Sequence, residues 1–174
     1  MQTTEILTTM ETKEIYLPEV KTEFLFTARI QVQAAMDVGP GPDGHRMIFM
    51  HQSGYFEGPK LRGEIISMSG GDWARVRADG SGAIDVRVCL KTHDGAIILM
   101  TYGGRMITTP ENFAYVMDYL KPDDPKGAEE RYYLRTNPLF ETGDQRYAWL
   151  NHIVAIGKGR TGDGGVIHEV FAVH

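Results

Sequence analysis

The chain has 174 residues, a net charge of −5 and a single cysteine, Cys89. This length fits one domain, since domains usually have about 100–200 residues. A single cysteine excludes an internal disulfide and a cysteine-based zinc cluster, and the mildly acidic composition without a basic stripe argues against nucleic-acid binding.

The amino-terminal stretch does not have the pattern of a signal peptide, because no long apolar region follows a charged one. No apolar run approaches the roughly 18 residues that are needed to span a bilayer. We therefore expect a cytoplasmic protein with no nucleic-acid partner and no membrane partner.

Short segments that alternate polar and apolar residues, or that form short apolar runs, follow one another from about residue 22. Turn residues close them, as at 39–44, 79–82 and 93–95, and the Asp-Gly pairs in these stretches suit tight hairpin turns. This spacing is typical of an all-β barrel or sandwich. We expect a flexible tail over residues 1–16 and a single domain over residues 17–174.

One segment has the pattern of a short helix instead. Thr109 can cap its start, Pro110 suits its first position and Pro122 would end it. The apolar residues at positions 113, 116, 117 and 120 would share one face. Such a helix could plug or cover a barrel, and residues 121–130 are expected to form a polar loop.

The stretch GKGRTG, residues 157–162, has the spacing of a dinucleotide-binding loop. That loop requires a helix after its glycines, whereas another strand is expected here, so we interpret the stretch as a hairpin turn. The six histidines form no metal-binding motif, and we predict no metal and no cofactor, although a site built from distant histidines on strands stays open. Cys89 lies in the middle of an expected strand, where a buried apolar role is favoured over a nucleophilic one.

The segment AIDVRVCL, residues 83–90, has two distinct faces. Because side chains alternate along a strand, Asp85, Arg87 and Cys89 share one face, and the other face carries Ile84, Val86, Val88 and Leu90. The polar row is either a solvated outer surface or the lining of a lumen. In a lumen, Arg87 would hold Asp85 ionised or bind a substrate oxyanion, while desolvation would raise the pKa of Asp85, as a general base requires.

The stretch FETGDQRYAWLN, residues 140–151, combines carboxylates, an arginine and aromatic side chains. We expect a strand, a turn at residues 143–144, and a second strand on which Tyr147, Trp149 and Asn151 share a face. At a barrel rim these side chains either face the mouth of a cavity or plug the end of the barrel.

Four longer segments are also informative together: GPDGHRMIFMHQSGYFEGPKLRGEI, GGDWARVRADG, AIDVRVCLKTHDGAIILMTYGGR and YYLRTNPLFETGDQRYAWLN. From about Leu17 to the carboxyl terminus, the chain resembles the family known as domain of unknown function 3237. The resemblance implies an antiparallel β-barrel that self-associates, here of about eight to ten strands with one short helix. The family's motif positions fall on Arg62, Asp72, Trp73, Asp85, Arg87, Tyr102, Arg135, Glu141, Tyr147, Trp149 and Asn151.

A barrel of about eight strands has room for one small ligand, so we expect Asp85 and Arg87 to lie in the lumen. We predict a cofactor-independent enzyme that uses acid–base chemistry, of the lyase, isomerase or cyclase type, on a small apolar or aromatic metabolite. Asp85 or Glu141 would be the base, and Tyr102 or Tyr147 the acid. The predicted catalytic residues are Asp85, Arg87, Tyr102, Glu141 and Tyr147, and the predicted substrate-binding residues are Arg62, Trp73, Arg135, Trp149 and Asn151.

Two other functions remain open. A non-catalytic carrier barrel would keep the aromatic walls but would need no carboxyl group with a shifted pKa. A purely structural oligomer would have a filled lumen and no pocket. In any of these cases we expect a homo-oligomer, a dimer or larger, for which the aliphatic row of residues 84–90 would suit the interface.

Overall fold

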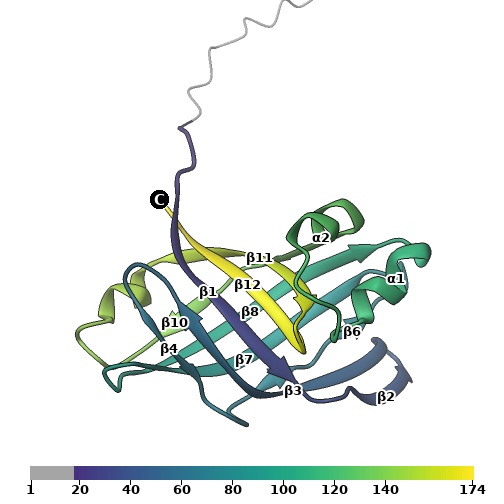
Figure 1. Ribbon diagram of the computed structural model, residues 1–174, viewed down its shortest axis with the longest axis horizontal. Helices are drawn as coiled ribbons and strands as arrows, with labels where there is room; N and C mark the ends of the chain where they lie inside the picture. Colours follow the sequence, from purple (N-terminus) through teal and green to yellow (C-terminus); the bar gives the residue numbers. More distant parts are fainter. Residues whose placement is uncertain (1–17) are drawn as a thin grey trace, which may run out of the picture.

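The computed structural model describes residues 18–174, and Figure 1 shows a barrel of antiparallel strands. The expected tail over residues 1–16 lies outside the described residues. The elements are β1 (Thr22–Val32), β2 (Met36–Gly41), β3 (Gly44–Glu57), β4 (Arg62–Ile65), β5 (Gly71–Asp72), β6 (Arg75–Val76), β7 (Gly82–Thr92), β8 (Ile97–Thr108), α1 (Pro110–Met117), α2 (Pro125–Arg131), β9 (Tyr132–Thr136), β10 (Leu139–Glu141), the 3-10 helix η1 (Ala148–His152), β11 (Val154–Gly162) and β12 (Gly165–Val173). None of the helices in residues 18–174 has the length and apolar character that crossing a membrane requires.

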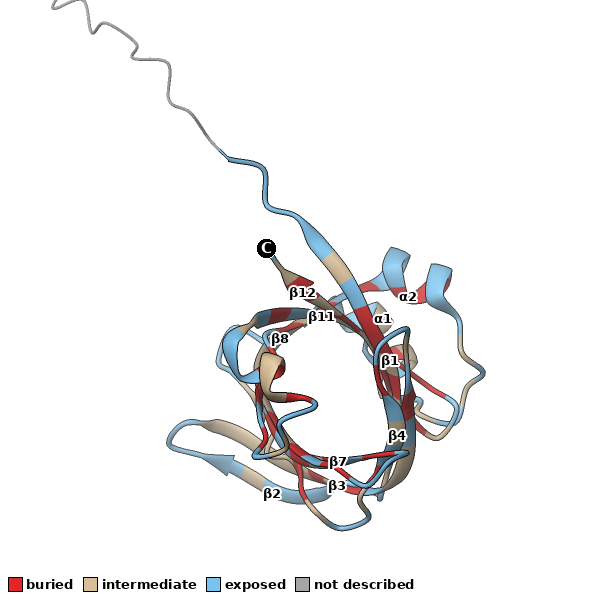
Figure 2. Ribbon diagram, turned by 90° about the vertical axis from the view of Figure 1, so that its left-hand side faces the viewer, coloured by how far each residue is buried: buried red, intermediate tan, exposed pale blue. Residues whose placement is uncertain are grey.

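The sheet closes on itself. Its ring runs β7–β8–β9–β11–β12–β1–β3–β4 and returns to β7, which makes eight strands, and every pairing in it is antiparallel. The short strands β5 and β6 also bridge β3 and β7. Figure 2 shows the strands surrounding one interior. The prediction of an antiparallel β-barrel of about eight to ten strands is therefore confirmed.

The interior of the barrel is the hydrophobic core. On β7 the aliphatic row faces inward, and Val86, Val88 and Leu90 are buried. They pack with residues from the other strands of the ring, among them Phe26 and Phe56. Burying one such side chain contributes about 1.5–3 kcal/mol. The expectation that residues 84–90 offer an aliphatic subunit interface is therefore wrong, because the lumen already covers that row.

The two ends of the barrel are closed by different segments. In Figure 1, α1 lies at one end and the yellow-green segment that contains η1 lies at the other. Helix α1 starts at Pro110 as expected, although Thr109 makes no side-chain cap hydrogen bond. Val116 of α1 is fully buried against Ala128, Tyr132 and neighbouring apolar side chains, which fixes α1 to the barrel.

Two local expectations are wrong. The segment expected as a polar loop, residues 121–130, contains most of α2, which Asp124 caps by accepting a hydrogen bond from the Gly127 N–H. The stretch GKGRTG belongs to strand β11 instead of a turn, and the turn follows at residues 163–164. Since β12 follows this turn, the glycines do not form a dinucleotide-binding loop.

Candidate functional site

A cavity of about 70 Å³ lies inside the barrel at the end that α1 closes. In this measure one water molecule needs about 10–15 Å³, so the cavity has room for roughly five. Phe113 of α1 lines the cavity and is 43% exposed, so it marks where the cavity reaches the surface. Most lining side chains are apolar: Ile30, Val32, Met47, Phe49, Val76, Ile84, Val86, Met106, Phe113, Met117, Leu134 and Val166.

Seven polar side chains interrupt this apolar lining. Arg75 of β6 and Thr161 of β11 are two of them, and the other five come from five separate segments. Strands β3, β5, β8 and β12 supply His51, Asp72, Tyr102 and His168, and the turn after α1 supplies Tyr119. Closure of the sheet brings these segments together, since they are far apart in the sequence. The cavity therefore combines a carboxyl group, a guanidinium group, three hydroxyl groups and two imidazoles inside an apolar shell.

Asp72 is held by backbone contacts around it. It pairs with Phe49 of β3 and Val86 of β7, whose side chains line the same cavity. Its Oδ1 accepts a hydrogen bond from the backbone N–H of Asp85 at 3.0 Å, and Arg46 Nη1 donates to the carbonyl oxygen of the next residue, Trp73, at 2.5 Å. These contacts fix one carboxylate oxygen and orient the short strand.

The environment of Asp72 changes its acidity. Burial among apolar side chains raises its pKa from the ordinary 3.8 to about 6, and the nearby charge of Asp85 acts in the same direction. The hydrogen bond from Asp85 and the charge of Arg46 oppose the shift but do not cancel it. The residue as a whole is half-buried, but it lines the mostly apolar cavity. A carboxyl group with this pKa can both take up and release a proton near neutral pH.

The two tyrosines of the cavity are protonated and free to bind. Burial raises the pKa of both Tyr102 and Tyr119, and the charge of Asp72 raises it further. Within the described part of the chain neither hydroxyl has a side-chain hydrogen bond that affects its acidity, whereas the hydroxyl of the buried Tyr132 accepts one from the Thr161 N–H. Buried hydroxyl groups usually have partners, so these two are available to a ligand or to water.

The two histidines are neutral at physiological pH. Burial lowers the pKa of both His51 and His168 to about 4. The His168 ring lies 5.2 Å from the Tyr102 ring, centroid to centroid, and His51 Nδ1 is buried with no hydrogen-bond partner among residues 18–174. Gly159 makes room for Leu134 and His168, since a Cβ there would lie 2.7 Å from Leu134 Cδ2 and 3.0 Å from His168 Cε1. Each neutral imidazole offers one donor and one acceptor.

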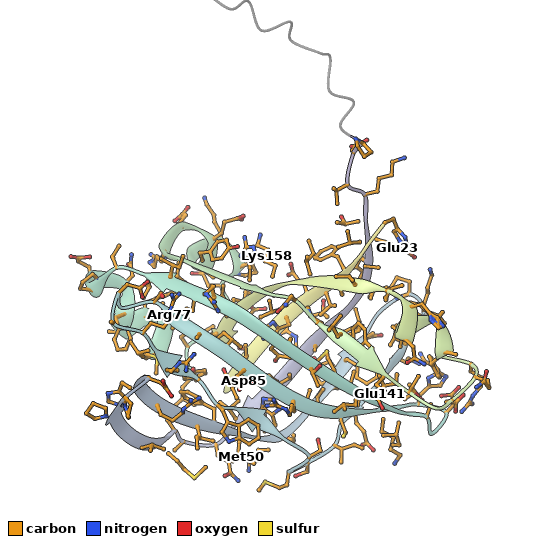
Figure 3. All side chains as sticks on the ribbon, turned by 180° about the vertical axis from the view of Figure 1, so that it is seen from behind. Glu23, Met50, Arg77, Asp85, Glu141 and Lys158 are labelled. Carbon is orange, nitrogen blue, oxygen red and sulfur yellow. The ribbon has the colours of Figure 1, made fainter. Side chains whose placement is uncertain are left out.

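Asp85 and Arg87, predicted to lie in the lumen, are on the outer face. Their side chains are 53% and 59% exposed and form an ion pair of 3.0 Å. Figure 3 labels Asp85 on the barrel wall. The alternation of β7 was predicted correctly, but the inward face is the aliphatic one, because the lumen is also the core.

Other predicted residues also lie away from the cavity. Arg62 and Glu141 are exposed, and Figure 3 labels Glu141 on β10. Arg135 is half-buried, donates to the backbone oxygen of Leu134 and has its guanidinium carbon 4.9 Å from the Tyr133 ring centroid. Trp73 is half-buried and does not line the cavity.

The stretch at residues 140–151 closes the other end of the barrel. The Tyr147 hydroxyl donates to Asp94 Oδ1 at 3.1 Å while its ring is part of the core. The Asn151 side chain makes two hydrogen bonds of 2.9 Å with the backbone of Thr142. Lys60 Nζ lies 5.6 Å from the centroid of the Trp149 ring. Residues 148–152 form η1 instead of the expected strand, so the structure favours the plugging interpretation of this corner.

Of the ten residues predicted from the sequence, Tyr102 lines the cavity and the other nine do not. Sequence reasoning missed Tyr119, His51 and His168 as site residues, and it noted Asp72 as a motif position without giving it a role. The histidines were considered as metal ligands alone. Within the described residues there is no group of three or more His, Cys, Asp or Glu that could hold a metal ion.

Comparisons with known proteins agree with this barrel. The chain matches the family model described as protein of unknown function (DUF3237) over residues 20–173. A UPF0311 protein of Rhodopseudomonas palustris (strain TIE-1) is 26% identical over 156 residues, which cover 90% of this chain and 98% of that protein. The crystal structure of a beta-barrel like protein from Acinetobacter baumannii AYE has a TM-score of 0.75 and 30% identity, covering 92% of this chain and 100% of that one.

A more distant crystal structure, of an enzyme from Penicillium herquei, has a TM-score of 0.68 at 21% identity and covers 93% of this chain and 100% of that one. At that identity the similarity concerns the fold alone. The resemblance predicted from the sequence is confirmed, because the family model spans nearly all of the described residues. The chain belongs to the family of proteins of unknown function named DUF3237.

Proposed function

We propose that the protein is a cofactor-independent enzyme that uses acid–base chemistry on a small apolar or aromatic metabolite bound in the cavity. One observation carries the proposal: the carboxyl group of Asp72 lies in a mostly apolar cavity that the buried Tyr102 and the half-buried Tyr119 also line. A carboxyl group in such a place, with one backbone hydrogen bond and no ion pair among residues 18–174, costs stability. Groups of this kind are concentrated at functional sites.

The proposed roles follow from the charge state of each group. With a pKa of about 6, Asp72 is mostly ionised at pH 7 and is a stronger base than an ordinary aspartate. Tyr102 and Tyr119 stay protonated and donate hydrogen bonds to substrate oxygen atoms. His51 and His168 stay neutral and position polar groups of the substrate. Reactions that move one proton away and return it, such as isomerisation, cyclisation or elimination, fit this set.

The description of the Penicillium herquei protein as an enzyme supports catalysis on this fold. A barrel of this kind is also used by unrelated functions, so the fold alone decides nothing about the reaction. The groups inside the cavity determine which reaction is possible.

The test is to incubate the purified protein with a small-molecule extract of the cells that make it, and to compare the extract by mass spectrometry before and after. Wild type should consume one compound and release a product of equal mass, or of that mass less water. Asp72→Asn should fold and leave that compound unchanged, whereas Asp79→Asn, an exposed aspartate in the turn before β7, should behave as wild type. Conversion by Asp72→Asn at the wild-type rate would refute the proposal.

A carrier is the second candidate, and the predominance of apolar side chains in the cavity favours it. A carrier would retain one compound from the extract and release it unchanged, and Asp72→Asn would retain it equally well. If the protein neither converts nor retains any compound of the extract, both candidates are contradicted.

Assembly and location are part of the proposal as well. We retain a cytoplasmic homo-oligomer, but with a different contact surface from the one expected. Phe24, Phe171 and Ile156 lie side by side on the outer face of β1, β12 and β11, where Phe24 and Ile156 are exposed. Light scattering of wild type and of Ile156→Glu tests this surface, since a monomeric wild type would contradict it.

A further inference from the structure

Tyr102 and Tyr119 approach the cavity from different elements, and each is held firmly. Tyr102 of β8 is buried, and its ring lies 5.2 Å from the ring of His168 of β12, centroid to centroid. The backbone oxygen of Tyr119 accepts from the Gly164 N–H at 2.7 Å, and its ring lies 5.5 Å from Phe49. Two residues later, Lys121 Nζ donates to Thr161 Oγ1 at 2.6 Å. The two rings are therefore fixed before any ligand arrives.

Asp72, Tyr102 and Tyr119 all line the same cavity of about 70 Å³, and the charge of Asp72 raises the pKa of both hydroxyls. Rigid donors that need no rearrangement are what a site requires in order to stabilise a developing oxyanion. A base beside such donors has the two parts needed to remove a proton from carbon next to a carbonyl group.

We infer that Tyr102 and Tyr119 form an oxyanion-binding site, and that the substrate is an uncharged carbonyl compound whose α-carbon gives a proton to Asp72. This inference rests on the proposed function and narrows it to one reaction class. The charged residues of the lining, Asp72 and Arg75, have opposite signs, and both histidines are neutral, so the cavity has no net charge to attract an ionic substrate.

The proton transfer balances within the site. The Asp72 carboxylate takes the α-proton, the C–H electron pair becomes a C=C bond, and the C=O π pair moves to oxygen. The resulting enolate oxygen accepts hydrogen bonds from the Tyr102 and Tyr119 hydroxyls. The Asp72 carboxyl group then returns its proton to another carbon of the conjugated system, which isomerises the substrate, or to a leaving hydroxyl group, which eliminates water.

The experiment uses 4-nitrophenol, whose yellow phenolate resembles an enolate in charge and shape. In Asp72→Asn the neutral amide mimics the protonated Asp72 that accompanies the enolate, and its oxygen can still accept from the Asp85 N–H. We expect this variant to bind the phenolate about tenfold or more tightly than wild type does, because the carboxylate no longer repels the anion. Titration is followed by the absorbance of the bound phenolate.

Removing either tyrosine hydroxyl should weaken phenolate binding by about tenfold or more, because hydrogen bonds to a charged group are strong. Tyr102→Phe and Tyr119→Phe, each combined with Asp72→Asn, should both show this loss. Tyr133→Phe in the same background is the control, since Tyr133 is an exposed tyrosine on β9. Circular dichroism establishes that each variant is folded.

The inference is overturned if Asp72→Asn binds only neutral 4-nitrophenol or binds none. It is also overturned if the Tyr102→Phe and Tyr119→Phe variants in this background bind the phenolate as tightly as Asp72→Asn alone. The phenolate test is separate from the test of the proposed function. The proposed function fails if wild type converts no compound of the cell extract, or if Asp72→Asn converts it as well as wild type does. Such conversion without phenolate binding would leave an acid–base enzyme of another reaction class.

Discussion

The backbone N–H of Asp85 donates a hydrogen bond to Asp72 Oδ1 at 3.0 Å, while the Asp85 side chain points outward to Arg87. The main chain of Asp85 is fixed by its pairing with Gly103 of β8. Strand β7 therefore orients the carboxyl group of Asp72 through its backbone, and the chemistry of the Asp85 side chain is not needed for this contact.

Replacing Asp85 by asparagine should accordingly have little effect. The backbone donor remains, and the lost ion pair is exposed, so the free energy of unfolding should change by less than about 1 kcal/mol. Turnover of the substrate found in the extract should stay within about twofold of wild type, a change of well under 1 kcal/mol in barrier. A loss of turnover in a folded Asp85→Asn protein would restore the hypothesis that Asp85 is the base.

Replacing Asp72 by asparagine should stabilise the protein at alkaline pH. The folded-state pKa of Asp72, about 6, exceeds its ordinary 3.8, so the folded state disfavours the ionised form above pH 6. The penalty at pH 8 is about 3 kcal/mol at most, and it disappears as the pH falls through 6 toward 3.8. Urea unfolding of wild type and variant at pH 8 and pH 4 measures the difference. An Asp72→Asn protein that is less stable at pH 8 would indicate that Asp72 has a structural role.

The two buried histidines, His51 and His168, should affect the pH dependence of stability in the opposite direction to Asp72. Their folded-state pKa of about 4 lies below the ordinary 6.5, so their contribution is present above pH 6.5 and is lost as the pH falls through 4. Each histidine accounts for about 3 kcal/mol at most over this range. His168→Gln should therefore show a flatter loss of stability between pH 6.5 and pH 4 than wild type, measured by urea unfolding. The exposed His152→Gln should keep the wild-type slope.

Tyr147 offers a test of the barrel corner. Since its hydroxyl donates to Asp94 at the end opposite the cavity, Tyr147→Phe should lose about 0.5–1.5 kcal/mol of stability, the usual value of one hydrogen bond. Thermal unfolding measures this loss. Affinity for 4-nitrophenolate in the Asp72→Asn background should not change, and a loss there would mean that the corner reaches the binding site.

The fold was largely predictable because strand alternation and turn residues are local signals. The Thr109-Pro110 pair and the following apolar spacing likewise predicted α1. Helix α2 was missed because its sequence, PKGAEER, has no apolar periodicity, and its buried residues are Gly127 and Ala128. The sequence around residues 147–151 alternates like a strand, but hydrogen bonds between Asn151 and Thr142 hold it in a corner.

The site was less predictable, for two physical reasons. Periodicity separates the two faces of β7 but does not say which face is inward, and the polar row of Asp85 and Arg87 was taken for the lining. Asp72 lies on a strand of two residues, too short for any periodic signal. His51 and His168 belong to β3 and β12, which are far apart in the sequence but lie on either side of β1 in the sheet.

The segment that carries Tyr119 depends on a buried ion pair a few residues away. Asp123 accepts from Arg160 Nε at 2.5 Å and from Arg29 Nη2 at 3.0 Å, and the Arg160 side chain is only 8% exposed. Breaking a buried pair by removing one partner leaves an uncompensated charge and typically costs about 3–5 kcal/mol. Asp123→Asn should lose roughly 3 kcal/mol, toward the lower end of that range, because Glu169 still pairs with Arg160.

The same substitution should also affect the site, because the Asp123 carboxylate ties residues 119–123 to Arg160 of β11 and Arg29 of β1. In the Asp72→Asn background it should weaken 4-nitrophenolate binding, since Tyr119 loses its fixed position. Glu130→Gln provides the matched control: it breaks the exposed pair with Lys126 on α2, and both stability and binding should stay at the level of the parent protein. If Asp123→Asn lowers stability but leaves phenolate affinity unchanged, Tyr119 is positioned by α1 and Gly164 alone, and Asp123 contributes only to the fold.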